Sequence, residues 1–167
     1  MTDETENAQT IRALQMIDPT FKMDTFMKDC REFIIPEIMD AVLNTDSETL
    51  HEWCSEATYN VLTAGFQAQI AQGLVSDCKI LELRNVELVS AKVLENDVPV
   101  LIVSFNTQEV TVFRNRLTRE VVFGKEDAIE EVTYACVITI TPETLSNPLT
   151  RGVRVMDMAK HNSRAYI

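Results

Sequence analysis

The apolar residues of this chain change their spacing once, near residue 75, and this change limits the folds that the chain can adopt. Before residue 75 they recur every three or four positions, which is the pattern of one face of a helix. After it they alternate with polar residues, most strictly over 131–141, which is typical of a strand with one buried face. Helices followed by strands predict an α+β domain, with N-terminal helices packed on an antiparallel sheet of about four strands.

Prolines divide the helical half of the chain. The first predicted helix covers 7–17 and ends before Pro19, because the residue that precedes a proline is pushed away from helical angles. A second helix is expected to be capped at 24–25 and to carry an apolar stripe through Pro36. Since proline removes one backbone donor, we expect this helix to be kinked or divided there.

The next helix is predicted to start at a cap on 46–47 and to stop at Gly73, with a break at 55–56 as the alternative to one continuous helix. In the strand half, the apolar phase shifts between Leu83 and Val86, which predicts a bulge. Long strands with a bulge should curve, and a curved sheet closed by helices leaves a concave apolar pocket. The expected features are strands at 79–94 and 99–113, a basic hairpin tip at 114–119, a short return at 120–123, a turn at 124–127, and strands at 131–141 and 152–158.

The length and the charge restrict the class of protein. A chain of 167 residues suits one domain, which we expect at 25–167, preceded by a helical arm at 1–24. The formal charge is −11, and residues 1–83 hold fifteen acidic against five basic side chains. Nucleic-acid binding requires a basic face that displaces counterions from phosphate, so this charge argues against a nucleic-acid partner. The acidic helical half is better suited to basic protein partners.

The sequence contains no recognisable catalytic or metal-binding constellation. The four cysteines are isolated from one another, so we expect buried thiols in a reducing compartment and no zinc site. No nucleophile elbow, phosphate-binding loop or dinucleotide motif occurs, and we therefore expect a protein that is not an enzyme and needs no cofactor. The carboxylates on the strands have polar or basic neighbours and are expected at solvated edges: Glu82, Glu87, Glu109 and Asp157.

Targeting signals are also missing from this sequence. No apolar run approaches the roughly 20 residues that span a bilayer. The acidic start of the chain resembles neither a secretory signal nor an Arg-rich transit peptide. We expect either a cytosolic protein or a domain of a longer precursor.

Three sets of side chains are candidates for binding. Apolar residues flanking Pro19 in the first two helices either pack on the domain or form an arm that docks on a membrane or a partner. Aromatic residues either fill the core or line a pocket for a lipid tail or apolar peptide: Trp53, Tyr59, Phe66, Phe105, Phe113 and Tyr134. Basic residues near the hairpin tip are either solvated or contact an anionic headgroup or a partner: Arg114, Arg116, Arg119 and Lys125.

Three ordered blocks of the sequence carry a family resemblance between about Ile17 and Met158. The blocks read IDPTFKMDTFMKDCREFIIPEIMDAVLNTD, LHEWCSEATYNVL and KILELRNVELVSAKVLENDVPVLIVSFNTQEVTVFRN. Together they resemble the C-terminal domain of the family of the mitochondrial translocase-of-the-inner-membrane forty-four subunit, an import-motor tether.

The resemblance implies a nuclear-transport-factor-two-like cone with a large apolar pocket. It implies a protein peripheral on the matrix side of the mitochondrial inner membrane, which recruits the matrix heat-shock-seventy chaperone mainly through an N-terminal region that this sequence lacks. The domain itself would contact cardiolipin-containing membrane, translocase channel subunits and presequences. The family's membrane contact maps to the first two helices, with Pro19 as the hinge and with these apolar positions: Ile11, Leu14, Ile17, Phe21 and Phe26.

Two alternatives remain open. A large-subunit protein of the mitochondrial ribosome shares this domain, and a cone with a pocket can also serve as a small-molecule binder or an enzyme. A buried carboxylate, or a tyrosine paired with one, at the floor of the pocket would favour the small-molecule alternative.

Overall fold

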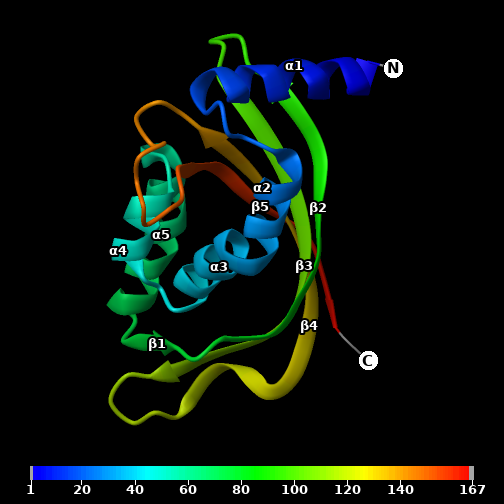
Figure 1. Cartoon of the computed structure of the whole chain (residues 1–167). Coiled ribbons are helices and arrows are strands. Elements are labelled where there is room, and N and C mark those ends of the chain that lie inside the picture. Colours follow the sequence, from blue (N-terminus) through cyan, green and yellow to red (C-terminus); the bar gives the residue numbers. More distant parts are fainter. Residues whose placement is uncertain (1, 166–167) are drawn as a thin grey trace.

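The computed structural model describes residues 2–165, which form five α-helices, one π-helical segment and five strands (Figure 1). The helices occupy the first half of the chain and the strands the second, as the change of apolar spacing predicts. The helical elements are α1 (Thr2–Ile17), α2 (Met23–Asp29), the π-helical segment η1 (Cys30–Ile34), α3 (Ile35–Leu43), α4 (Ser47–Trp53) and α5 (Glu56–Ala71). The strands are β1 (Leu74–Ser76), β2 (Lys79–Val93), β3 (Pro99–Asn115), β4 (Val121–Ile140) and β5 (Val153–Ala165).

The five strands form one antiparallel sheet in which β3 is central. Both β1 and β2 pair with one edge of β3, at its end and along its length respectively. The other edge of β3 pairs with β4, and β4 in turn pairs with β5. Because β1 and β2 follow each other along the same edge, the sheet is effectively four strands wide. This arrangement confirms the predicted α+β fold with an antiparallel sheet of about four strands.

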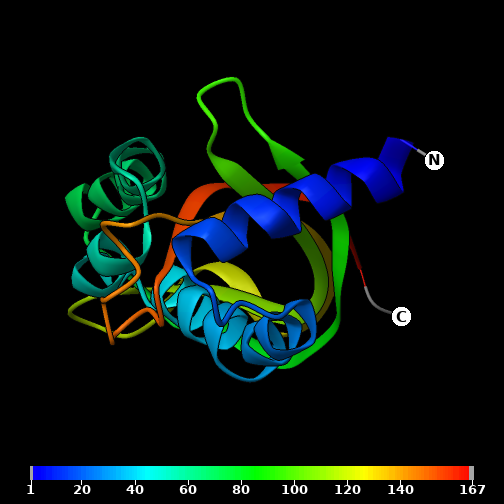
Figure 2. The same cartoon turned by 45° about the horizontal axis from the view of Figure 1, so that its top comes forward.

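The sheet curves around the helices, and its inner face supplies most of the core. Alternate residues of β4 from Val132 to Ile140 are buried, as their strict alternation predicts. They meet buried residues of η1 and α3, among them Ile34, Ile38 and Met39. Helix α1 crosses one end of the curved sheet, where it contacts β2 and β3 (Figure 2).

The two prolines act where the sequence predicts. Helix α1 ends at Ile17, directly before the turn that contains Pro19, although it begins at Thr2 and is therefore longer than predicted. Pro36 lies at the start of α3, directly after the π-helical segment, in which the Ile35 N–H donates to the carbonyl of Cys30. Proline and π-helical turns are both recognised causes of a kink in a helix, and here they lie next to each other. The predicted cap at 24–25 is wrong, because α2 begins at Met23 after Lys22, which provides no side-chain cap.

The remaining helix ends follow the expected capping chemistry. The Asp46 carboxylate accepts from the Thr49 N–H and caps α4, and the Ser55 hydroxyl accepts from the Thr58 N–H and caps α5. The chain therefore breaks between α4 and α5, so the continuous helix is excluded. Gly73 ends α5 with φ of +72°, a conformation that glycine adopts without a steric penalty.

Two of the register shifts in the strands bear on the sequence predictions. The predicted bulge is present, because the register of β2 shifts between Arg84 and Glu87. The predicted turn at 124–127 is wrong, because β4 runs through it. The register passes from Val112 opposite Gly124 to Val110 opposite Ile129, so residues 125–128 bulge out of an otherwise continuous strand. The final strand is also longer than predicted and extends to Ala165.

Candidate functional site

The apolar side chains proposed for membrane contact point into the domain. Leu14 is fully buried, and Phe21 and Phe26 are 5% and 6% exposed, with their ring centroids 5.8 Å apart. Ile11 and Ile17 are half-buried, and Ile17 packs against the core. In this conformation the buried side chains of Leu14, Phe21 and Phe26 pack on the domain, while the predicted division between an arm at 1–24 and a domain at 25–167 stays a prediction.

Pro19 lies in an exposed turn that is held by hydrogen bonds between residues close in sequence. The Asp18 carboxylate accepts from the Thr20 N–H at 3.0 Å and from the Thr20 hydroxyl at 2.7 Å. The Phe21 N–H donates to the Asp18 carbonyl at 2.9 Å, and the Gln15 amide donates to the Phe21 carbonyl at 3.3 Å. Hinge motion at Pro19 stays a prediction, and these short-range bonds are what such motion would break.

The six candidate aromatic residues do not surround one pocket. Phe105 stacks on Tyr134 with centroids 5.2 Å apart. Tyr59 lies at the groove described below, and Phe113 lies 6.2 Å from Phe123 near the hairpin tip. Four of the six are buried in the core: Trp53, Phe66, Phe105 and Tyr134.

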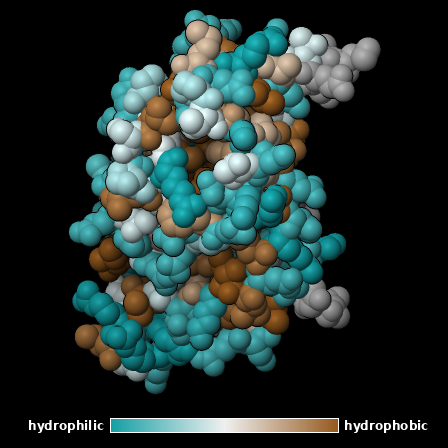
Figure 3. All heavy atoms as spheres, in the orientation of Figure 1, coloured by the Kyte–Doolittle hydropathy of each residue, from teal (hydrophilic) through white to brown (hydrophobic). Residues whose placement is uncertain are grey.

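A pocket of about 420 Å³ lies between α3 and the start of β2, and its lining mixes apolar side chains with Asp40, Asn44 and Lys79. Figure 3 shows apolar surface at this position below α3. The half-buried thiol of Cys78 is at its edge, with Sγ 3.6 Å from the carbonyl of Val112. The lining consists of Pro36, Met39, Asp40, Leu43, Asn44, Cys78, Lys79, Ile80 and Leu83.

A polar groove lies on the other side of the helices, along α4 and α5. Its main hollow holds about 460 Å³ and continues into a smaller one that shares His51, Glu52 and Tyr59. The His51 and Tyr59 rings meet edge to face at 5.3 Å and form one wall. The Arg154 guanidinium on the other wall donates to the Cys54 carbonyl at 3.4 Å. The carboxylates that line the two hollows are Glu48, Glu52 and Glu56.

Glu109 is buried, contrary to the solvated edge that its polar neighbours predict. It is 4% exposed on the inner face of the sheet rather than solvated at an edge. The Tyr134 hydroxyl donates to its Oε2 at 2.7 Å, and the Thr107 hydroxyl donates to the same oxygen. Burial and the neighbouring Glu109 raise the pKa of Tyr134 well above its usual range, so its hydroxyl stays a donor. Glu109 does not line the pockets described above.

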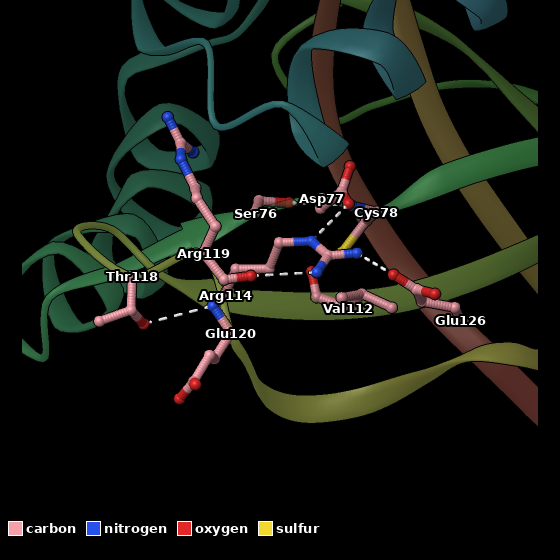
Figure 4. Close-up of polar contacts among 9 residues, drawn as sticks. All are labelled: Ser76, Asp77, Cys78, Val112, Arg114, Thr118, Arg119, Glu120 and Glu126. Carbon is pink, nitrogen blue, oxygen red and sulfur yellow. Dashed lines mark hydrogen bonds and ion pairs between the residues drawn. The ribbon is translucent and has the colours of Figure 1, made fainter.

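Arg114 lies at the end of β3, opposite Val121, and its side chain is held by polar contacts (Figure 4). Its Nε donates to Asp77 Oδ2 at 2.8 Å, another nitrogen donates to Glu126, and a third donates to the Arg119 carbonyl at 3.1 Å. These bonds, first that to Asp77, raise the pKa of Arg114, and the same bond lowers the pKa of Asp77. Arg114 is therefore engaged, while the exposed basic side chains of the candidate set are those of Arg116, Arg119 and Lys125.

A metal site and a membrane-spanning helix are both absent from the described part of the chain. Residues 2–165 contain no group of three or more His, Cys, Asp or Glu side chains that could hold a metal ion. Within the same range, no helix has the length and apolar character needed to cross a bilayer.

N-terminal helices enclosed by a curved antiparallel sheet define an α+β cone. The intermembrane-space region of the chloroplast protein ARC6 has this fold, with a TM-score of 0.52 and 12% identity over 85% of this chain and 98% of that chain. A model of the Tim44-like domain matches residues 7–160. The chain therefore belongs to the Tim44-like domain family.

Curated relatives carry the same domain within longer proteins. The mitochondrial import inner membrane translocase subunit TIM44 of Saccharomyces cerevisiae is 36% identical over 98% of this chain. The subunit of the same name from Homo sapiens is 37% identical over 93% of it. The aligned regions cover 38% and 34% of those two proteins, so the chain spans well under half the length of the relatives that it matches.

Proposed function

We propose that this chain is a non-enzymatic adaptor domain of the mitochondrial inner-membrane preprotein translocase, peripheral on the matrix side. The match of the Tim44-like domain to residues 7–160 carries this proposal, because it covers both the helices and the sheet. Channel subunits, incoming presequences and cardiolipin-containing membrane are the proposed partners of the domain itself. The matrix heat-shock-seventy chaperone would be tethered mainly by the rest of a longer protein.

The groove along α4 and α5 is the surface that best suits a presequence. Presequences are basic and amphipathic, and the groove combines the carboxylates of Glu48, Glu52 and Glu56 with the rings of His51 and Tyr59. Complementary charge raises the rate and specificity of such an encounter, and the aromatic wall supplies apolar contact.

Membrane contact through the first helices requires α1 to leave the sheet. The side chains of Leu14, Phe21 and Phe26 are buried in this structure, so they reach lipid only after the turn at Pro19 opens. We propose that bilayer binding and packing against β2 compete for the same apolar side of α1. The lipid affinity of α1 is then lowered by the free energy of undocking it.

Photocrosslinking in intact mitochondria tests the adaptor proposal. A photoreactive residue at Glu52 should capture presequences and channel subunits, and a matched residue at exposed Val61 on α5 should capture them far less. Crosslinks only to ribosomal proteins would support the ribosomal relative instead.

Ile11→Ser with Ile17→Ser should weaken vesicle binding by α1, whereas Met16→Ser, at an 87% exposed position on the same helix, should not.

A further inference from the structure

The tip of the β3–β4 hairpin exposes large apolar side chains. We define the tip as residues 116–125, all of which are exposed. Leu117 is 85% exposed, Phe123 62% and Val122 57%. The tip lies at the end of the molecule opposite α1 (Figure 1), and apolar spheres lie among polar ones at that lower end in Figure 3. Large apolar side chains exposed close together in the chain make this segment a candidate contact surface.

Basic side chains surround this apolar group. Arg116, Arg119 and Lys125 are exposed, and the ion pairs found within residues 2–165 do not involve their side chains. Glu120 is the acidic residue of the tip itself; of the two acidic residues that follow the tip, Glu126 is paired with Arg114 and Asp127 is exposed. The tip thus presents an excess of cations beside apolar side chains, although the chain as a whole carries a charge of −11.

Hydrogen bonds fix the conformation of the tip in the unbound chain. The Asn115 side chain accepts from the N–H groups of Leu117 and Thr118 at 2.8 and 3.0 Å. The Arg116 N–H donates to the Gly73 carbonyl at 2.9 Å, which ties the tip to the end of α5. Polar contacts hold Arg114 at the end of β3, next to the tip, as Figure 4 shows. Little conformational entropy remains to be lost when such a loop docks.

We propose that the β3–β4 tip is an interfacial anchor for an anionic bilayer. Leu117 and Phe123 enter the boundary between headgroups and acyl chains, while Arg116, Arg119 and Lys125 contact lipid phosphates. Apolar insertion and cationic attraction are the two signals that a stable peripheral contact requires. The inference rests on the proposed function, which puts this chain beside a cardiolipin-containing membrane. It assigns the contact to the tip while α1 stays packed.

The charge pattern favours a bilayer over a protein partner of this domain. Other exposed apolar side chains lie on α5, at Val61 (74%) and Ile70 (60%), but α5 has no basic residue. Of the tip and α5, only the tip combines apolar with cationic side chains. The apolar side of α1 is meanwhile turned inward, since Leu14 is fully buried. In this conformation the tip is better equipped for contact with anionic lipid than either α5 or α1.

Flotation of the full chain with vesicles tests the proposal. Vesicles of phosphatidylcholine with cardiolipin should recruit the chain, and vesicles of phosphatidylcholine alone should recruit it weakly. Leu117→Ser should lower the partition coefficient about tenfold, the effect of withdrawing one large apolar side chain from an apolar phase. Arg116→Gln with Arg119→Gln should lower it about 25-fold on anionic vesicles, or about fivefold for each cation. Val61→Ser is the matched control and should float like the unchanged chain.

A second readout reports insertion directly. Phe123→Trp adds an indole at the tip, and its emission should shift to shorter wavelength on cardiolipin vesicles. Trp53, which is 2% exposed, should contribute a constant background. No shift, or flotation of Leu117→Ser equal to that of the unchanged chain, would overturn the proposal.

The controls separate this inference from the proposed function. Loss of flotation in Ile11→Ser with Ile17→Ser, but not in the tip variants, would assign the contact to α1 and remove the tip. A chain that binds no vesicle, or a photoreactive residue at position 117 that captures protein instead of lipid, would also refute the tip anchor. The crosslinking of Glu52 in mitochondria would still decide the adaptor role.

Discussion

Docking of α1 can be measured through one side chain. Leu14 is fully buried where α1 crosses β2 and β3, and it belongs to the same core as Val86 of β2. Truncating a fully buried leucine to alanine costs about 2–5 kcal/mol, because the lost apolar contact adds to the cavity left behind. Since α1 lies at one end of the core and can settle partly into the gap, we expect about 3 kcal/mol for Leu14→Ala. For a chain of this size that corresponds to a melting temperature lower by about 6–12 °C.

Urea unfolding and amide hydrogen exchange are the appropriate measurements. Leu14→Ala should lower the free energy of unfolding and speed exchange within 2–17. Met16→Ala, at an 87% exposed position two residues away, should change stability by less than about 0.5 kcal/mol. Equal stability of the two variants would mean that α1 is not docked in solution, and the burial of its apolar side would then not limit membrane contact.

Three further predictions concern the rest of the domain. Asp46→Ala should cost about 1 kcal/mol at pH 7. Hydrogen bonds from the Thr49 hydroxyl and N–H lower the pKa of Asp46 below its ordinary value near 3.8. The charged cap therefore stabilises the fold fully above pH 3.8 and loses this effect as the pH falls through the lowered pKa. The difference in melting temperature between the unchanged chain and Asp46→Ala should thus be smaller at pH 2.5 than at pH 7. Cys78 should be alkylated first at pH 8, because burial raises the pKa of Cys30 to about 12 and of Cys54 to about 11; equal rates in mass spectrometry would contradict this. Gly124→Ala should destabilise the β4 bulge, since a Cβ there would lie 1.9 Å from the Thr111 carbonyl oxygen; an unchanged melting temperature would contradict the bulge geometry.

Local chemistry explains which parts of the fold were predictable. Apolar spacing separates helices from strands, and Pro19, Pro36 and Gly73 end or distort helices through their own backbone constraints. Local chemistry does not predict the bulge at 125–128, because the sequence Gly-Lys-Glu-Asp has the composition of a turn. Whether such residues reverse the chain or only bulge from it depends on the pairing of β3 with β4, which is not a local property.

The errors at the candidate sites come from partners distant in sequence. Glu109 looked solvated because Gln108 precedes it, but adjacent strand residues face opposite sides. Its real neighbours are Thr107, two residues away on the same face, and Tyr134, which the register of β4 brings close. Arg114 likewise pairs with Asp77, 37 residues earlier in the chain. The spacing of Thr107 and Glu109 was the one signal available, and it needs the strand phase to be interpreted.

The contacts between the α4–α5 pair and β5 have a consequence for the order of folding. The Thr58 hydroxyl donates to the Met156 carbonyl across 98 positions, and the Ser55 N–H donates to the Val155 carbonyl. These helices therefore reach their final position only after the last strand has joined the sheet. Native contacts between such distant residues slow folding, and until β5 arrives the apolar sides of Leu50 and Phe66 lack their final packing. During synthesis, α4 and α5 should therefore wait for β5 before they complete their packing.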